Sequence, residues 1–227
     1  NVRVIDTNGT AVAMAVVVGQ RKMQTPIFSA NLQYVTLNPQ WGVPDSIARN
    51  EVIPKLLKDP DYLVSHNMVI RKSYDLNTPE ITQDSVDWAA YLLEEKDKEE
   101  MTYKFIEVPS KKNGLGRVKF IFPNKHSVYM HDTQSKSLFK RKVRTYSHGC
   151  VRLEKPVVML DYISKNYTEK TPEEVEEWYD SLETHHMGLT KKLPVHTAYL
   201  TTYVDECGDL LVLNDIYGFD KSQKLNF

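Results

Sequence analysis

One short stretch of the chain concentrates the side chains that can do chemistry. It runs from residue 125 to residue 156 and contains three histidines and a cysteine, namely His126, His131, His148 and Cys150. Cysteine is scarce, because only Cys150 and Cys207 occur in 227 residues. A cysteine that follows a His-Gly pair and stands two positions before an arginine is a candidate nucleophile.

The residues around Cys150 are suited to activating a thiol. A free thiol has a pKa of about 8.5, and a neighbouring imidazolium or guanidinium lowers that pKa to roughly 3.5–7.5. His131 precedes Cys150 by 19 residues, which permits a strand, a loop and a return that bring the imidazole to the thiol. Gly149 lets the backbone bend closely, so we expect the amides of His148, Gly149 and Cys150 to form an oxyanion hole, worth about 2.7–4 kcal/mol per donor.

The order of these residues resembles a known signature. His131-Asp132-Thr133, a loop and then Ser-His-Gly-Cys-Val-Arg over 147–152 resemble the YkuD-type L,D-transpeptidases, which are cysteine enzymes of peptidoglycan cross-linking; sixteen residues, 132–147, separate His131 from the His-Gly-Cys-x-Arg run. Further segments resemble the large YcbB-like branch of that family, namely 25–29, 38–44 and 116–124. The resemblance extends from about residue 12 to residue 219.

The resemblance implies a role for each residue of the signature. Cys150 is expected to be the nucleophile, and His131 the general base that activates the thiol and later moves the proton. The backbone carbonyl of Asp132 would hold the imidazole tautomer. His148 is expected to contribute its amide rather than its ring, and Arg152 either holds the loop or pairs with a carboxylate.

Four residues are the candidate substrate-binding positions, namely Tyr129, Ser147, Trp41 and Asp132. Tyr129 shares a face with His131 if their segment is a strand, because side chains two positions apart point the same way. A core role is the alternative for Tyr129, and also for Trp41, whose Asn-Pro-x-Trp loop lies near the active site in the family. By the same alternation, His126 would face away from His131.

The implied reaction is a two-step acyl transfer. Cys150 would attack a peptidoglycan tetrapeptide stem and release its terminal D-alanine, and a diamino-acid side-chain amine of another stem would resolve the thioester into a 3-3 cross-link. The resemblance also implies carbapenems, which are β-lactams, as covalent inhibitors and the periplasm or cell envelope as the location. Water or a lipoprotein as acceptor, an unrelated Cys-His amidase and a non-catalytic wall-binding module stay open as alternatives.

No cofactor and no metal are expected. His131, His148 and Cys150 offer three possible zinc ligands, but neither Cys-x-x-Cys nor His-Glu-x-x-His spacing accompanies them. Zinc bound to Cys150 would also quench the nucleophile. Cys207 lies at a predicted hairpin tip, and the family reading predicts no disulfide between it and Cys150.

The composition limits the classes of partner that the chain is expected to bind. The net charge of −1 lacks the basic footprint of a general nucleic-acid-binding protein. No apolar run approaches the roughly 20 residues of a membrane-spanning helix, and no signal peptide is recognisable. Five basic residues occur between 135 and 144, which indicates either a solvated loop or a surface that attracts the carboxylates of an anionic stem.

The pattern of elements predicts a mainly β (α+β) fold, a YkuD-like sandwich or barrel with an inserted helical subdomain and additional C-terminal helices. Expected strands lie in a hairpin over 2–18 and at 32–37, 105–108, 118–122, 127–131, 194–204 and 210–215. Expected helices occupy 45–57, a segment capped by Thr82, 156–167 and a segment after a Thr171 capping box. His185 and His186 are expected at the end of that last helix.

The whole chain, 1–227, is predicted to be one catalytic domain in which 50–104 is an inserted lid, or capping subdomain. Its composition turns charged after residue 58, and 94–100 looks like a solvated charge run. A helical decoration without a gating role is the alternative.

Overall fold

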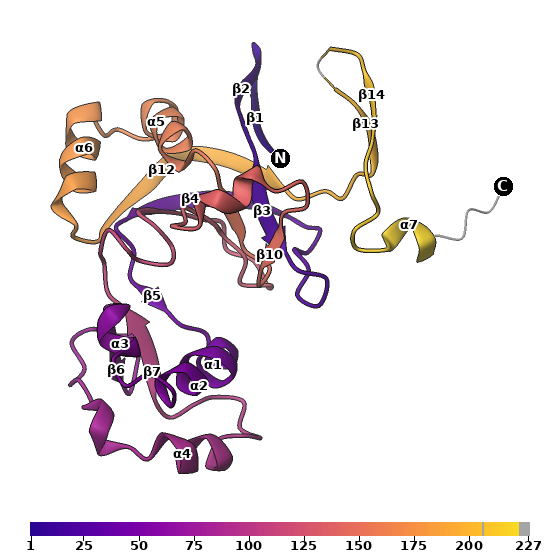
Figure 1. Ribbon diagram of the computed structural model, residues 1–227. Helices are drawn as coiled ribbons and strands as arrows, with labels where there is room; N and C mark the ends of the chain where they lie inside the picture. The colour runs from indigo at the N-terminus through magenta and orange to yellow at the C-terminus, as the bar shows by residue number, and fades with distance from the viewer. Residues whose placement is uncertain (206, 223–227) are drawn as a thin grey trace.

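A seven-stranded mixed sheet forms the centre of the computed structural model, which describes residues 1–205 and 207–222. The strand order is β10-β3-β11-β9-β8-β4-β12 (Figure 1). The strands are β3 (Val16–Gly19), β4 (Ser29–Leu37), β8 (Val118–Ile121), β9 (Met130–His131), β10 (Thr145–Ser147), β11 (Val151–Leu153) and β12 (His185–His196).

Alternation along these strands places apolar side chains on one face of the sheet. Val35, Phe120 and Leu153 are fully buried there, and helix α5 (Pro156–Tyr167) packs against them in the same core. Burying a side chain of this size contributes about 1.5–3 kcal/mol. The buried stripe of α5 runs through Met159, Leu160 and Ile163, whereas Val157 is exposed.

The ends of the chain form two hairpins outside the main sheet. β1 (Val2–Asp6) pairs with β2 (Gly9–Met14), as the turn signal at residues 6–9 predicts. β13 (Thr202–Val204) pairs with β14 (Leu210–Val212), and the short helix α7 (Phe219–Ser222) follows. Both hairpins project from the body in Figure 1.

The capping box at Thr171 is confirmed at the start of α6 (Pro172–Ser181), where the Thr171 hydroxyl accepts from the Glu174 amide. The placement of His185 and His186 at the helix end is wrong. They begin β12, which pairs with β4 through residues 185–188 and 193–196, with an irregularity between, and starts nine residues before the predicted strand. The His185 ring stacks on the Trp178 ring of α6, with 4.7 Å between ring centroids.

A second, smaller sheet of order β5-β7-β6 lies apart from the main sheet in Figure 1. Its elements surround a separate apolar core that runs from Val43 to Phe105. The predicted insertion, 50–104, falls within this region, and its role as a lid stays a prediction. The elements are β5 (Trp41–Gly42), α1 (Asp45–Ile47), the π-helix η1 (Ala48–Val52), α2 (Ile53–Leu56), α3 (Tyr62–Ser65), β6 (Met68–Arg71), the 3-10 turn η2 (Gln83–Ser85), α4 (Trp88–Glu94) and β7 (Lys104–Glu107).

Three details of this region differ from the sequence prediction. Thr82 precedes only a 3-10 turn, and Asp87 caps the helix by accepting from two amides of its first turn. Pro54, which has no amide hydrogen to donate, is accommodated at the start of α2 behind a π turn. Glu95, in the predicted solvated run, is buried and binds Lys98 and Thr102.

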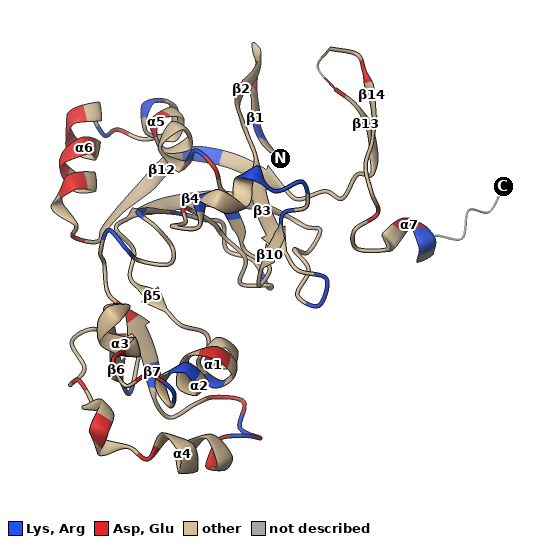
Figure 2. Ribbon diagram, in the orientation of Figure 1, with Lys and Arg blue, Asp and Glu red and all other residues tan. Residues whose placement is uncertain are grey.

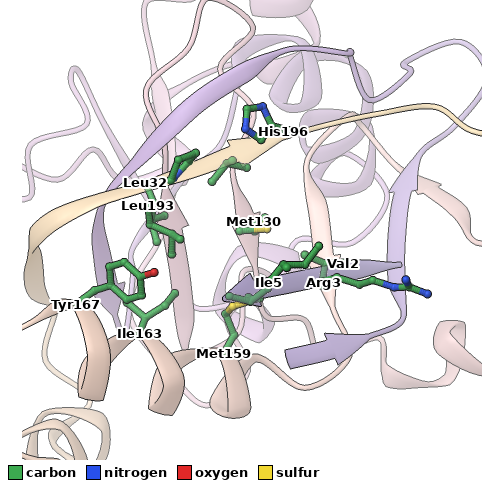
Figure 3. Close-up of a pocket in the computed structure, with 13 residues that line it drawn as sticks. Val2, Arg3, Ile5, Leu32, Met130, Met159, Ile163, Tyr167, Leu193 and His196 are labelled. Atoms are coloured by element: carbon green, nitrogen blue, oxygen red, sulfur yellow. The ribbon is translucent and has the colours of Figure 1, made fainter. Parts of the chain in front are cut away.

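The structure combines a large mixed sheet with several helices, which confirms the predicted α+β, YkuD-like fold class. No helix in the described ranges is both long and apolar enough to cross a membrane. Beneath the main sheet, an apolar cavity of about 440 Å³ lies between β1, β12 and α5. Figure 3 shows Met130 and Ile163 among its lining side chains.

Candidate active site

A cleft of about 480 Å³ opens between the main sheet and the smaller sheet. Met130 faces the apolar cavity, whereas its neighbours Tyr129 and His131 line the cleft, so alternation along β9 separates core from site. The main-sheet wall consists of His126, Ser127, Tyr129, His131, Ser147, His148, Cys150 and Arg152. The opposite wall includes Trp41, Ile47, Glu51, Tyr62, His66, Met68 and Glu107.

Strand register aligns three basic side chains in a row beside the cleft. Lys119 of β8 lies opposite His131 of β9, and His131 lies opposite Arg152 of β11. Residues directly opposite each other in a sheet share a face, so the three form a row beside the cleft. Sequence analysis missed Lys119, although its position between the apolar Val118 and Phe120 would have indicated it.

Cys150 lies immediately before β11 and is partly buried. Its Sγ is 4.0 Å from the Ser127 carbonyl oxygen, and the following amide, Val151, donates to the Tyr129 carbonyl at 3.0 Å. Burial raises the pKa of the Cys150 thiol, and hydrogen bonds to Tyr129 and the charges of Lys119 and Arg152 offset only part of that rise. The predicted lowering of this pKa is therefore wrong for the free enzyme, because desolvation outweighs the neighbouring cations.

His131 is 5% exposed and uncharged at neutral pH. Burial, together with the adjacent Arg152 and Lys119, lowers the pKa of the imidazole to about 3. The Asp132 backbone opposes this shift by hydrogen bonding to the imidazole, although within the described chain the buried Nδ1 does not meet the geometry of a close hydrogen bond, so the tautomer-holding role of the Asp132 carbonyl stays a prediction. A neutral imidazole beside a protonated thiol is the pair required for general-base activation during attack.

The two cations of the row have no carboxylate partner among the residues that the structure describes. Lys119 Nζ lies 4.0 Å from the centroid of the Tyr129 ring, and Arg152 Nε is buried without a hydrogen-bond partner in the described residues. The site is therefore electropositive and suited to a thiolate, an oxyanion or a carboxylate. Of the two roles left open for Arg152, this favours binding an anion.

Ser147 and Gly149 shape the loop that carries the thiol. The Ser147 hydroxyl donates to the Cys150 carbonyl at 2.5 Å and accepts from the Gly149 amide at 3.1 Å. Gly149 adopts φ +113°, which favours glycine, and its carbonyl accepts from the Thr25 hydroxyl at 2.8 Å. Because the Gly149 amide donates to the Ser147 hydroxyl, it does not act as the predicted oxyanion donor in this arrangement. The Ser147 hydroxyl, a predicted substrate-binding group, makes both of these hydrogen bonds within the loop.

Asp132 is buried and holds two turns together. Its carboxylate accepts from the Arg117 amide at 2.9 Å and from the Thr133 amide at 2.7 Å, and it pairs with Lys136 at 2.5 Å. Gly116 makes room for it, because a Cβ there would stand 2.2 Å from Asp132 Oδ2. Asp132 does not line the cleft, so its placement among the substrate-binding residues is wrong.

Tyr129 and Trp41 line the cleft from opposite walls. The Tyr129 ring lies 5.6 Å from the His131 ring, and burial raises the pKa of its hydroxyl. Trp41 also packs against the second core, so it serves both the cleft and the fold. His126 lines the cleft too, contrary to prediction, because the turn at Ser127, with φ +54°, breaks the strand alternation.

One contact joins the two walls at the mouth of the site. His148 Nε2 lies 2.8 Å from Glu51 Oε1 of η1, and both side chains are partly exposed. The His148 ring thus faces the smaller sheet and its helices, and sequence analysis contained no signal for this pairing.

Figure 2 shows Lys and Arg gathered on the segment that precedes β10, which contains the 3-10 turn η3 (Lys136–Lys140). Lys136 pairs with Asp132, and Arg144 donates to the carbonyls of Val16 and Arg141. Both cysteines are free thiols. Within residues 1–205 and 207–222, no group of three His, Cys, Asp or Glu residues is placed to hold a metal ion.

The chain is similar to known proteins of one family. The YkuD family, the L,D-transpeptidase catalytic domain, matches residues 1–176. A protein of Haemophilus influenzae named "Putative L,D-transpeptidase" is 30% identical over 212 residues, which are 92% of this chain and 40% of the relative. The chain therefore spans about 40% of the length of that relative.

Cys150, immediately before β11, and the neutral His131 of the adjacent parallel strand β9 line one cleft of a sheet-rich α+β fold, an arrangement suited to nucleophilic acyl transfer. The chain belongs to the YkuD family of L,D-transpeptidase catalytic domains.

Proposed function

We propose that the protein is a peptidoglycan L,D-transpeptidase that joins tetrapeptide stems by 3-3 cross-links. The observation that carries the proposal is the one cleft lined by Cys150, His131 and Arg152, whose guanidinium forms no ion pair within the part of the chain that the structure describes. Transfer of an acyl group from a substrate that bears a carboxylate requires a thiol as nucleophile, a neutral base for its proton and a cation without a partner to bind negative charge.

In the first step the Cys150 thiol attacks the carbonyl that precedes the terminal D-alanine of a donor stem. The thiol proton passes to neutral His131, and a C–S bond forms. Lys119 and Arg152 face the negative charge that develops on sulfur and on the carbonyl oxygen. The C–N bond to D-alanine then breaks, and the imidazolium returns the proton to the leaving amine, which leaves a thioester on Cys150.

In the second step the side-chain amine of a diamino acid on another stem attacks the thioester. A C–N bond forms, the C–S bond breaks and the thiol is restored. The opposite wall, which contains Trp41, Tyr62 and Met68, lies where this acceptor would enter.

Three further properties belong to the same proposal. A β-lactam such as a carbapenem would acylate the same thiol, because its strained carbonyl is a carbonyl electrophile of the same kind. The location would be the periplasm or cell envelope, where peptidoglycan is exposed. The smaller sheet and its helices would act as a lid, because Glu51 contacts the nucleophile loop at His148.

Mass spectrometry of the protein incubated with a disaccharide-tetrapeptide tests the proposal, with Cys150→Ala in parallel. We expect an adduct on Cys150 and a dimer that lacks one D-alanine, both abolished in the variant. Release of D-alanine without a dimer would replace transpeptidation by carboxypeptidation. Unchanged substrate with wild-type protein would contradict the proposal for this chain.

A further inference from the structure

The wall opposite Cys150 contains a carboxylate for which the fold provides no cation. Glu107, at the end of β7, is 4% exposed and lines the cleft. Its Oε1 accepts from the Gly114 amide at 3.0 Å, and no described Lys, Arg or His forms an ion pair with it. Carboxylates are rarely buried without a partner, so an uncompensated one in a cleft calls for a ligand.

The Trp41 ring and the backbone of Gly114 lie next to the Glu107 carboxylate. A Cβ added at Gly114 would stand 3.2 Å from Glu107 Oε2 and 3.4 Å from two atoms of the Trp41 ring. The carboxylate oxygen, the indole and the glycine therefore meet around one point. A negative oxygen next to an aromatic face is the combination that binds an ammonium group.

We infer that Glu107, Trp41 and Gly114 form an ammonium subsite that binds the side-chain amine of the acceptor. The inference rests on the proposed transpeptidation, and it assigns the acceptor to the wall opposite Cys150. The ligand class is a primary alkylamine on a flexible chain, with its cation on Oε2 and its methylene groups along the indole.

This placement also provides a base for the second step. The acceptor arrives as an ammonium ion and transfers one proton to Glu107, and the resulting amine attacks the thioester. His131 takes the second nitrogen proton and passes it to the departing thiolate, so an amide and a thiol result. Glu107 then releases its proton to water, and the net reaction yields one free proton.

The electrostatics suit this role. Burial raises the pKa of Glu107 to about 7, with the Gly114 amide opposing, so the carboxylate is a stronger base than an exposed one. Trp41 of β5, Met68 of β6 and Gly114 of the adjoining turn contribute no charge. The other titratable groups described as lining the cleft on this side are Glu51, Tyr62, His66 and Lys112, and none of them forms an ion pair with Glu107.

Glu107→Gln separates the subsite from a merely structural role, because glutamine keeps an oxygen to accept from Gly114 and loses only the charge. With tetrapeptide donor, the variant should acylate Cys150 and release D-alanine at the wild-type rate. The yield of dimer relative to hydrolysed stem should fall at least tenfold, with a higher KM for the acceptor. The wild-type rise of this ratio between pH 6 and pH 8 should be weakened.

Gly114→Ala is the matched steric variant, because its methyl group would fill the subsite while Glu107 keeps its charge. It should also lower the dimer yield and preserve acylation. An unchanged ratio and pH profile in Glu107→Gln would overturn the inference while leaving the acylation chemistry intact. Absence of any adduct in wild-type protein would instead refute the proposed function.

Discussion

The two walls of the cleft each contain a buried titratable side chain, and burial moves the two in opposite directions. On the main-sheet wall, the pKa of His131 falls to about 3, while on the smaller wall that of Glu107 rises to about 7. In both cases the neutral form is favoured, because a charge loses its hydration when it is buried. Neutral His131 can therefore accept a proton near the thiol, whereas Glu107 accepts one across the cleft only in its ionised form, which exists in substantial amount near pH 7.

The walls differ in how their charges are balanced. The main-sheet wall holds two cations without a carboxylate partner in the described chain, Lys119 and Arg152, and the smaller wall holds Glu107 without a cation. The cleft is therefore polarised across its width, with positive charge on the main-sheet wall and negative charge on the smaller wall. An anionic donor suits one side and a cationic acceptor the other, which orients the two substrates of one acyl transfer.

The largest expected effect lies on the main-sheet wall. His131→Gln should lower the rate of Cys150 acylation by roughly 10²–10⁴, because the thiol loses the base that removes its proton. Stopped-flow acylation by a carbapenem measures this step without an acceptor. Glu107→Gln is the control from the other wall. An equal loss of acylation rate in both variants would contradict the assignment of acylation to the main-sheet wall and of acceptor binding to the smaller wall.

A stability measurement tests the smaller wall. The raised pKa of Glu107 means that its contribution to folding stability is present below its unfolded pKa, near 4.5, and is lost as the pH rises through about 7. Between pH 4.5 and pH 8, Glu107→Gln should therefore gain about 1–3 kcal/mol relative to wild type. Urea unfolding at both pH values measures the gain, and a stability difference that is equal at the two pH values would show that folding does not raise the pKa of Glu107.

A smaller effect concerns the charge beside the thiol. Lys119→Met removes a cation that favours the Cys150 thiolate, so the pH at which iodoacetamide reacts should move upward and the rate at pH 8 should fall roughly tenfold. Lys119→Arg is the matched control that keeps the charge. A uniform fall in rate without a shift of the pH profile would point to lost packing on Tyr129 instead.

The smallest effect concerns the contact between the walls. Glu51 and His148 are both partly exposed, so a double-mutant cycle to alanine should give only about 0.2–1 kcal/mol of coupling, reduced by salt. Hydrogen exchange over residues 45–56 should accelerate in Glu51→Ala if the contact restrains this wall. Exchange that matches wild type would count against the lid.

Several features of the protein were readable in the amino-acid order. The Ser-His-Gly-Cys-Val-Arg run, the distance back to His131, the Thr171 capping box and the first hairpin depend on local chemistry and short-range periodicity, which a sequence displays directly. The YkuD family and its α+β class followed from that signature.

Tertiary structure decided which charges are compensated. Lys119 joins His131 and Arg152 only through the register of three strands, Glu51 meets His148 across 97 positions, and Glu107 faces the cleft because a second sheet folds opposite the first. Burial then reversed the expected pKa shift of Cys150 and took Asp132 out of the cleft. Solvation and pairing of charged groups depend on the packing of distant segments, which local pattern does not encode.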